Sequence, residues 1–216
     1  MNVLPKSVLL LGATGLVGGE CLKLLATAAA FLRVVVLTRK PLQALSSPRI
    51  ESHQINFDDP ASFRTYLNVD TVICALGTTI KKAGSQDAFR KVDYEYPLMF
   101  AKLALEAGAR HFLLVSSAGA NPQSRVFYSR VKGEIEAAVS NLGYPALSIF
   151  RPSLLLGHRT EFRLGELIGQ KIVGPLGFLM SRSVRPIHAS QVAAAIVKAA
   201  HSDTSGVRLL SNADML

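Results

Sequence analysis

The sequence VLLLGATGLVGGE, residues 8–20, combines a strand, a glycine-rich turn and the start of a helix. Its first four residues are apolar, which is typical of a buried strand, and residues 20–25, ECLKLL, follow a helical pattern. Glycines stand at positions 12, 15 and 18, a G-x-x-G-x-x-G spacing. With a strand before it and a helix after it, such a spacing indicates a dinucleotide-binding turn.

Each of these glycines has an expected role. Gly12 allows the tight turn, Gly15 lets the backbone approach a pyrophosphate, and Gly18 lets the helix lie close to the sheet. The backbone amides at the positive end of the helix dipole then face the phosphates. The alternative is a strand followed by a flexible turn that binds nothing. The amides expected to face the phosphates are those of residues 14–17, and the residues of this turn expected to bind the cofactor are Gly12, Ala13, Thr14, Gly15, Leu16 and Val17.

Composition and charge exclude several classes of protein. The chain has 216 residues, of which 49 % are hydrophobic, so a disordered chain is excluded. The net charge is +9, but the positive residues are scattered and form no basic tail or Arg-rich repeat. Specific nucleic-acid binding is therefore not expected, and attraction of an anionic cofactor or substrate explains the charge more simply.

The sequence also predicts a cytoplasmic protein. No charge-free apolar stretch reaches the length of about 18 residues that a membrane span needs, so no membrane insertion is expected. Residues 1–20 resemble a signal peptide, but glycines interrupt their apolar run, and the dinucleotide turn explains them better. The two cysteines, Cys21 and Cys74, are expected to be reduced.

Beyond the first strand and helix, strand-like and helix-like stretches alternate. This alternation predicts an α/β fold, a Rossmann-type doubly wound parallel sheet with helices on both faces. Pro97 is expected to kink or divide the longest helix. The expected strands span 32–38, 50–57, 71–75, 111–115 and 146–150, and the expected helices span about 60–66, 86–107 and 127–141.

The last third of the chain is less regular. We expect a helix over 161–173, a helix over 190–201 capped by Ser190, and a final strand over 207–210. Residues 1–216 are thus predicted to form one NAD(P)-binding domain, in which 151–216 contribute a small C-terminal extension on the substrate side.

The end of the second strand carries basic residues where an NAD-binding protein usually has an acidic one. Arg39 and Lys40 follow Thr38 there, so NADP(H) is expected to be preferred over NAD(H). The alternative is that both are ordinary surface charges.

A Tyr-x-x-x-Lys pair, Tyr128 and Lys132, lies on one face of a predicted helix. A phenol becomes a useful acid or base near pH 7 when a nearby cation favours its ionised form. Lys132 supplies that cation, and Tyr128 then exchanges a proton with a carbonyl oxygen. The preceding strand ends in Ser116-Ser117, two further hydrogen-bond donors. The expected catalytic residues are Ser116, Ser117, Tyr128 and Lys132.

These motifs together resemble the short-chain dehydrogenase/reductase superfamily in its atypical branch. They are GATGLVG at 12–18, Ser116-Ser117, the Tyr128/Lys132 pair and the sequence RPS at 151–153. The stretches CALGTT at 74–79 and FYSRVKGE at 127–134 are most similar to the Tat-interacting-protein group of oxidoreductases. The resemblance spans residues 7–200.

The resemblance assigns further residues to the cofactor. Three features depart from the family pattern: Asn56 replaces a frequent Asp, Asp93 replaces a frequent Asn, and the serines lie slightly closer to Tyr128 than usual. The resemblance implies that Asn56 and Phe57 line the adenine pocket, that Leu76, Gly77 and Thr78 pass along the ribose, and that Pro152, Ser153 and Leu154 flank the nicotinamide.

The expected function is an NADPH-dependent reductase of a small carbonyl or enone-like molecule. The alternative is a non-catalytic NADP(H)-binding regulator or redox sensor that acts through a protein partner. His158 and His188 are candidate catalytic groups, although loop histidines satisfied by backbone or water are the simpler interpretation. The sequence contains no metal-ligand spacing and no nucleophile triad.

Overall fold

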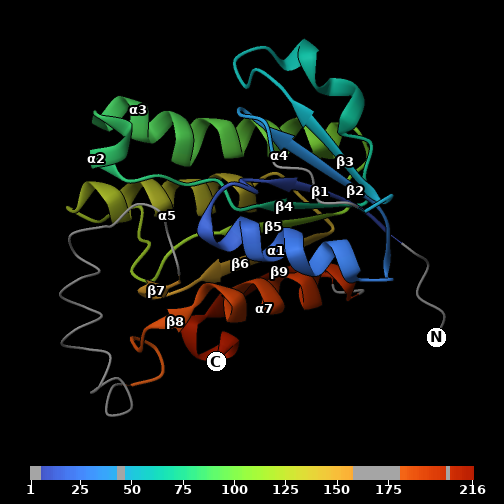
Figure 1. The fold of residues 1–216 in the computed structure, drawn as a ribbon. Coiled ribbons are helices and arrows are strands. Elements are labelled where there is room, and N and C mark those ends of the chain that lie inside the picture. Colours follow the sequence, from blue (N-terminus) through green and yellow to red (C-terminus); the bar gives the residue numbers. More distant parts are fainter. Residues whose placement is uncertain (1–5, 43–46, 158–180, 203–204) are drawn as a thin grey trace.

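Seven parallel strands form one sheet in the order β3-β2-β1-β4-β5-β6-β9 (Figure 1). The computed structural model describes residues 6–42, 47–157, 181–202 and 205–216. Two short strands, β7 and β8, pair in parallel with each other beside this sheet. The strands are β1 Lys6–Leu11, β2 Phe31–Thr38, β3 Ile50–Gln54, β4 Thr71–Cys74, β5 His111–Val115, β6 Ala146–Arg151, β7 Leu155–Leu156, β8 Ile187–His188 and β9 Gly206–Ser211.

Helices cover both faces of the sheet, which confirms the predicted α/β doubly wound architecture. Helices α4 and α5 pack on one face, and α1 and α7 pack on the other (Figure 1). No helix in the described ranges is long and apolar enough to cross a membrane. The α-helices are α1 Leu16–Thr27, α2 Ile80–Ala83, α3 Gln86–Arg90, α4 Tyr96–Glu106, α5 Phe127–Ser140 and α7 Ala189–His201, and the shorter helical turns are η1 Pro60–Ser62, η2 Arg64–Tyr66, η3 Lys91–Glu95 and η6 Asn212–Met215.

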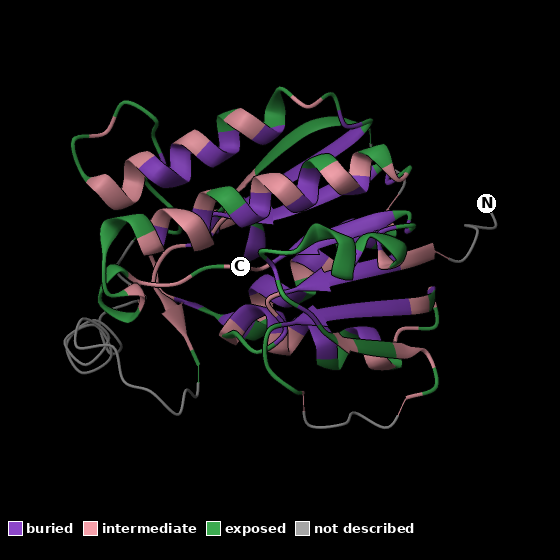
Figure 2. Cartoon of the chain, turned by 90° about the horizontal axis from the view of Figure 1, so that it is seen from above, coloured by how far each residue is buried: buried purple, intermediate pink, exposed green. Residues whose placement is uncertain are grey.

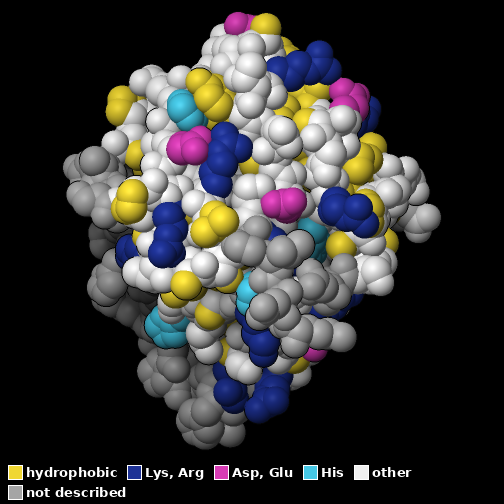
Figure 3. Space-filling view, turned by 90° about the vertical axis from the view of Figure 1, so that its right-hand side faces the viewer, with side chains coloured by type: hydrophobic (Ala, Val, Ile, Leu, Met, Phe, Trp, Pro, Cys, Tyr) yellow, Lys and Arg dark blue, Asp and Glu magenta, His cyan; other side chains and the backbone are white. Residues whose placement is uncertain are grey.

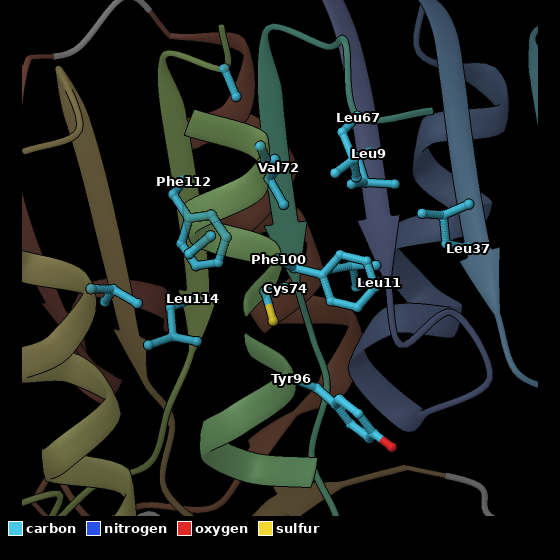
Figure 4. Close-up of a cluster of buried hydrophobic side chains, with 14 of the residues drawn as sticks. Leu9, Leu11, Leu37, Leu67, Val72, Cys74, Tyr96, Phe100, Phe112 and Leu114 are labelled. Atoms are coloured by element: carbon cyan, nitrogen blue, oxygen red, sulfur yellow. The ribbon is translucent and has the colours of Figure 1, made fainter. Parts of the chain in front are cut away.

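The central strands are buried on both faces, so their sequences are continuous apolar runs rather than alternating ones. In β1, residues 8–11 are fully buried; Leu9 and Leu11 point toward Phe100 of α4 (Figure 4), whereas Val8 and Leu10 face the α1 and α7 side. Figure 2 shows the same distribution, with buried residues along the strands and exposed residues on the outer sides of the helices. This core fixes the strand ends on which the site is built.

The long helix expected over 86–107 is divided into three parts. A π-helical turn, η3, separates α3 from α4, and the Tyr96 backbone N–H donates to the Lys91 carbonyl five residues back. Pro97 follows immediately and has no N–H to donate, so the regular backbone hydrogen bonds of an α-helix are already interrupted there. Pro97 therefore divides the helix, and the wide turn places Asp93 in the interior.

Three other boundaries differ from the sequence-based expectations. The third strand ends at Gln54 because the Asn56 side chain accepts from the Asp58 backbone N–H, at 3.0 Å, and forms a turn. Residues 60–66 form two 3₁₀ turns rather than one helix, with the Asp59 side chain capping the first. His188 rather than Ser190 caps α7.

The last third of the chain contributes to the main sheet and its core. β9 pairs along the whole length of β6, and α7 packs beside α1 over the sheet. The helix expected over 161–173 lies outside the described residues.

His111, the first residue of β5, gives the fold a defined pH dependence. It is 5 % exposed, and its Nε2 lies 3.0 Å from Ser148 Oγ on the neighbouring strand. Burial, with the positive charges of Lys6 and Arg208, lowers the pKa of His111 to about 4. The unfolded chain takes up this proton near pH 6.5, so between pH 6.5 and about 4 it binds more protons than the folded chain. The free energy of unfolding therefore decreases as the pH falls through this range.

As the pH falls through this range, we expect the free energy of unfolding to decrease by about 2–3 kcal/mol less in His111→Gln than in wild type. The reason is that each pH unit by which the pKa is shifted corresponds to about 1.4 kcal/mol. Urea unfolding at pH 7.5 and pH 4.5 measures the difference. His201→Gln, at the exposed end of α7, is the matched control. The same loss of stability in wild type and His111→Gln would refute the assignment.

Candidate active site at the carboxyl ends of the strands

The site lies where the sheet changes its winding direction. β1 and β4 are neighbours, and the chain leaves β1 toward α1 on one face and β4 toward α4 on the other. In doubly wound sheets ligands bind at this switch point, outside the carboxyl ends of the strands.

The glycine-rich turn has the geometry that a pyrophosphate needs. Gly12 has a φ of +86°, and a Cβ at this position would lie 2.4 Å from the Ala75 carbonyl oxygen. A Cβ on Gly18 would lie 2.1 Å from the Gly12 carbonyl oxygen, so only glycine lets α1 approach the turn. Gly15 is the N-cap of α1, no side chain caps the helix, and both Thr14 and Gly15 are exposed. The free amides of a 12-residue helix thus fit a dinucleotide phosphate.

Basic side chains stand at the end of β2, where the adenosine ribose of a dinucleotide would lie. Arg39 and Lys40 are exposed, and the buried Thr38 hydroxyl donates to the Lys40 carbonyl at 2.7 Å. The Arg39 guanidinium lies 5.7 Å from the centre of the Phe57 ring.

The two residues assigned to the adenine pocket differ in their surroundings. Phe57 is only 3 % exposed, and its ring packs edge-on against Phe100 and Tyr96 in the core. Asn56 is exposed and uses one lone pair of its side-chain oxygen in the turn to Asp58. Phe57 therefore belongs mainly to the hydrophobic core. The Asn56 side-chain amide, in contrast, can still form hydrogen bonds on the solvent side.

Tyr128 and Lys132 lie one turn apart near the start of α5, as the spacing predicts. The Lys132 side chain is 6 % exposed, and its Nζ lies 2.7 Å from Oδ1 of the fully buried Asp93. Asp93 Oδ2 accepts from the Thr78 backbone N–H at 2.8 Å. A Cβ on Gly77 would lie 3.4 Å from Asp93 Oδ1, so the loop 76–78 covers this ion pair closely.

The ion pair keeps Lys132 charged. Burial lowers the pKa of Lys132, but the opposing effects of Asp93 and Tyr128 outweigh it, and the pKa is raised. Asp93 is thus a site residue whose partner the sequence did not reveal. The sequence signals for it were its place on the long helix, four residues before Pro97, and the frequent Asn that it replaces in the family pattern.

Ser116 and Ser117 bring two unused donors to the site. They follow β5, and the Ser116 backbone N–H donates to the Phe150 carbonyl at 2.8 Å. Both hydroxyls are buried and have no hydrogen-bond partner among the described residues. Buried hydroxyls are normally paired, so their free capacity fits a polar ligand atom. The Tyr128 ring is also held in place, at 5.6 Å from the buried Phe89.

The residues assigned to the nicotinamide side follow β6. The Pro152 carbonyl accepts from the Ala118 backbone N–H at 2.8 Å, which joins this segment to the loop after Ser117. The Ser153 backbone N–H donates to Oδ1 of Asn212 at 2.9 Å, and the Asn212 amide donates to the carbonyls of Arg182 and Arg185. Leu154 accepts from the Ile187 N–H through its carbonyl. The buried Asn212, which the sequence analysis did not identify, thereby connects three segments.

His188 has a structural role that explains it without catalysis. It caps α7, and its backbone N–H donates to the Gln191 side chain at 3.1 Å. His158 lies outside the described residues.

Comparison with known proteins places the chain in a family. A family model described as NAD(P)H-binding matches residues 12–143. Protein HTATIP2 of Rattus norvegicus is 38 % identical over 174 residues, which cover 79 % of this chain and 72 % of that protein. Protein FMP52, mitochondrial, of Candida albicans is 35 % identical over 208 residues, which cover 93 % and 90 %.

Solved structures share the fold. MoeE5 in complex with UDP-glucuronic acid and NAD has a TM-score of 0.75 at 17 % identity, covering 94 % of this chain and 75 % of that one. A dTDP-4-dehydrorhamnose reductase from Clostridium acetobutylicum has a TM-score of 0.65 at 20 % identity, covering 95 % and 74 %. At these identities the likeness concerns the fold alone.

The comparisons correct one expectation and confirm another. The prediction of a cytoplasmic protein is wrong. The FMP52 relatives of Emericella nidulans and Candida albicans are named as mitochondrial. Lack of a transmembrane stretch says nothing about the compartment in which a protein resides. The family resemblance, in contrast, is confirmed: the chain belongs to the NAD(P)H-binding family, with HTATIP2 and FMP52 among its relatives.

Proposed function

We propose that this protein is an NADP(H)-dependent reductase of a small carbonyl or enone-like substrate. The observation that supports the proposal is the buried, ion-paired Lys132 one turn after Tyr128 on α5, together with two buried serine hydroxyls after β5 that have no partner in the described structure. A protein that only senses its cofactor needs neither a proton donor nor unpaired hydroxyls.

Each residue has a chemical role in this proposal. The bound cofactor supplies the hydride. Ser116 or Ser117 donates a hydrogen bond to the substrate carbonyl and orients it, while Tyr128 transfers its phenolic proton to the carbonyl oxygen. Lys132 holds the nicotinamide ribose from its place beside the loop 76–78.

The residues at the end of β2 support a preference for NADP(H). Arg39 and Lys40 are exposed there, and no acidic side chain occupies positions 38–40 to accept hydrogen bonds from both ribose hydroxyls. Arg39 also acts electrostatically on Asp58, but the Asp58 carboxylate already pairs with Lys91 at 2.8 Å and accepts from the Tyr96 hydroxyl at 2.9 Å. Arg39 therefore remains available for a 2′-phosphate.

A small molecule fits the charge distribution better than a nucleic acid. On the face at the amino ends of the strands, Lys and Arg side chains are dispersed among acidic and apolar ones (Figure 3). The positive residues are also scattered along the sequence and form no basic tail, so we propose no specific nucleic-acid binding. A protein partner is part of the alternative function, that of a regulator.

The test is a turnover screen. Purified protein is mixed with NADPH and a panel of aldehydes, ketones, enones and quinones, and NADPH oxidation is followed by absorbance. We expect at least one member of the panel to be reduced, with NADPH used in preference to NADH. Tight NADPH binding without turnover of any member would favour the regulator.

A further inference from the structure

Asn212, the first residue of η6, joins the C-terminal turn to two other segments of the chain through a buried amide. It is 1 % exposed, and its Oδ1 accepts from the Ser153 backbone N–H at 2.9 Å. Its Nδ2 donates to the carbonyls of Arg182 and Arg185 at 2.8 and 2.9 Å, and the Ser153 hydroxyl donates to the same Arg185 carbonyl. The amide thus uses both of its hydrogens and one oxygen lone pair. Because leaving buried polar groups unpaired is costly, Asn212 fixes these segments relative to one another.

The segment 153–157 reaches from the loop after the two serines to the glycine-rich turn. Just before it, the Pro152 carbonyl accepts from the Ala118 backbone N–H of that loop at 2.8 Å. At its end, a Cβ on Gly157 would lie 2.7 Å from Cδ1 of Leu16, the first residue of α1. Between these two contacts β7 pairs with β8. The segment is therefore held at both ends and along its length, and Asn212 binds it at its first residue.

This segment lies on one side of the switch point between β1 and β4. In the sheet order, β2 and β3 lie beyond β1, whereas β5 and β6 lie beyond β4. The adenosine of a dinucleotide would lie over the end of β2, so its other half, with the nicotinamide, would extend over the ends of β4 and β5. The segment 153–157 follows β6 and returns to the start of α1. It therefore adjoins the nicotinamide half of a bound cofactor and not the adenosine half.

We propose that Asn212 is a positioning residue, which fixes the segment 153–157 at the place where the nicotinamide half of the cofactor binds. The inference rests on the NAD(P)H site of the proposed function, but not on turnover. A binding surface that is ordered before the ligand arrives costs less free energy than one that the ligand must order. Loss of the Asn212 amide therefore weakens binding of the whole dinucleotide and leaves binding of its adenosine half unchanged.

The test compares each dinucleotide with its adenosine half by calorimetry, without substrate. NADPH is paired with 2′,5′-ADP and NADH with AMP, so the test does not depend on which cofactor the protein prefers. In Asn212→Ala we expect both dinucleotides to bind about 10-fold more weakly, the effect of about one to two lost hydrogen bonds, and both adenosine halves to bind as in wild type. Ser148→Ala is the matched control and should leave all four affinities unchanged. Ser148 is a buried serine of β6 whose hydroxyl lies 3.0 Å from Nε2 of His111, the first residue of β5.

Ser153→Ala keeps the test decisive if Asn212→Ala fails to fold, because it removes only the hydrogen bond from the Ser153 hydroxyl to the Arg185 carbonyl. We expect it to weaken dinucleotide binding by about three- to tenfold and to leave the adenosine halves unaffected. Equal weakening of dinucleotide and adenosine half would overturn the inference. So would an unchanged dinucleotide affinity in Asn212→Ala, or in Ser153→Ala where Asn212→Ala does not fold. The expected binding results without any turnover would instead count against the proposed reductase function alone.

Discussion

Arg39→Ala is expected to weaken NADPH binding by about 10- to 150-fold and to leave NADH binding nearly unchanged. A charge-assisted bidentate contact with the 2′-phosphate contributes about 1.5–3 kcal/mol, and NADH lacks that phosphate. Arg39 is exposed at the end of β2 and lies over the Phe57 ring, so no ion pair with a described residue must break before it binds phosphate.

Fluorescence or calorimetric titration of both cofactors against wild type and variant measures the effect. Arg64→Ala is the matched control, because Arg64 is also exposed but is paired with Glu106 on the α4 side of the sheet. If Arg39→Ala weakened both cofactors equally, or if wild type bound both equally, Arg39 would be only a surface charge.

Local sequence signals predicted the main strands and helices of this protein well. The strand over 111–115 and the start of α5 at Phe127 agree with the structure, because buried parallel strands are short apolar runs and α5 keeps a regular amphipathic period. The tight turn at Gly12 and the close helix approach at Gly18 could also be predicted, since both glycines belong to one strand–turn–helix unit.

The features that sequence analysis missed depend on contacts between distant segments. Asp93 meets Lys132, 39 positions later, only because η3 turns it inward, and a π-helical turn has no strong local signal. Asn212 connects Ser153 with the segment 182–185, which lies about 30 residues away from either in sequence. His188 rather than Ser190 caps α7 because β8 positions it there.

Tyr128→Phe is expected to lower turnover by about 100-fold or more while NADPH affinity stays within a few-fold of wild type. The variant removes the proton donor and leaves the aromatic ring, which retains its packing 5.6 Å from Phe89. Because no hydrogen bond of the Tyr128 hydroxyl to a described residue contributes to the fold, we expect little change in stability. Tyr66→Phe, in η2, is the matched control, since its ring stacks on His53 and lies outside the site.

The decisive measurement is the rate of NADPH oxidation with the best substrate of the panel, at saturating NADPH, in wild type and Tyr128→Phe side by side. We predict that the variant binds NADPH as wild type does and reduces the substrate at most about one-hundredth as fast. Equal rates in the two proteins would show that the phenol of Tyr128 donates no proton in the reaction and would contradict the account.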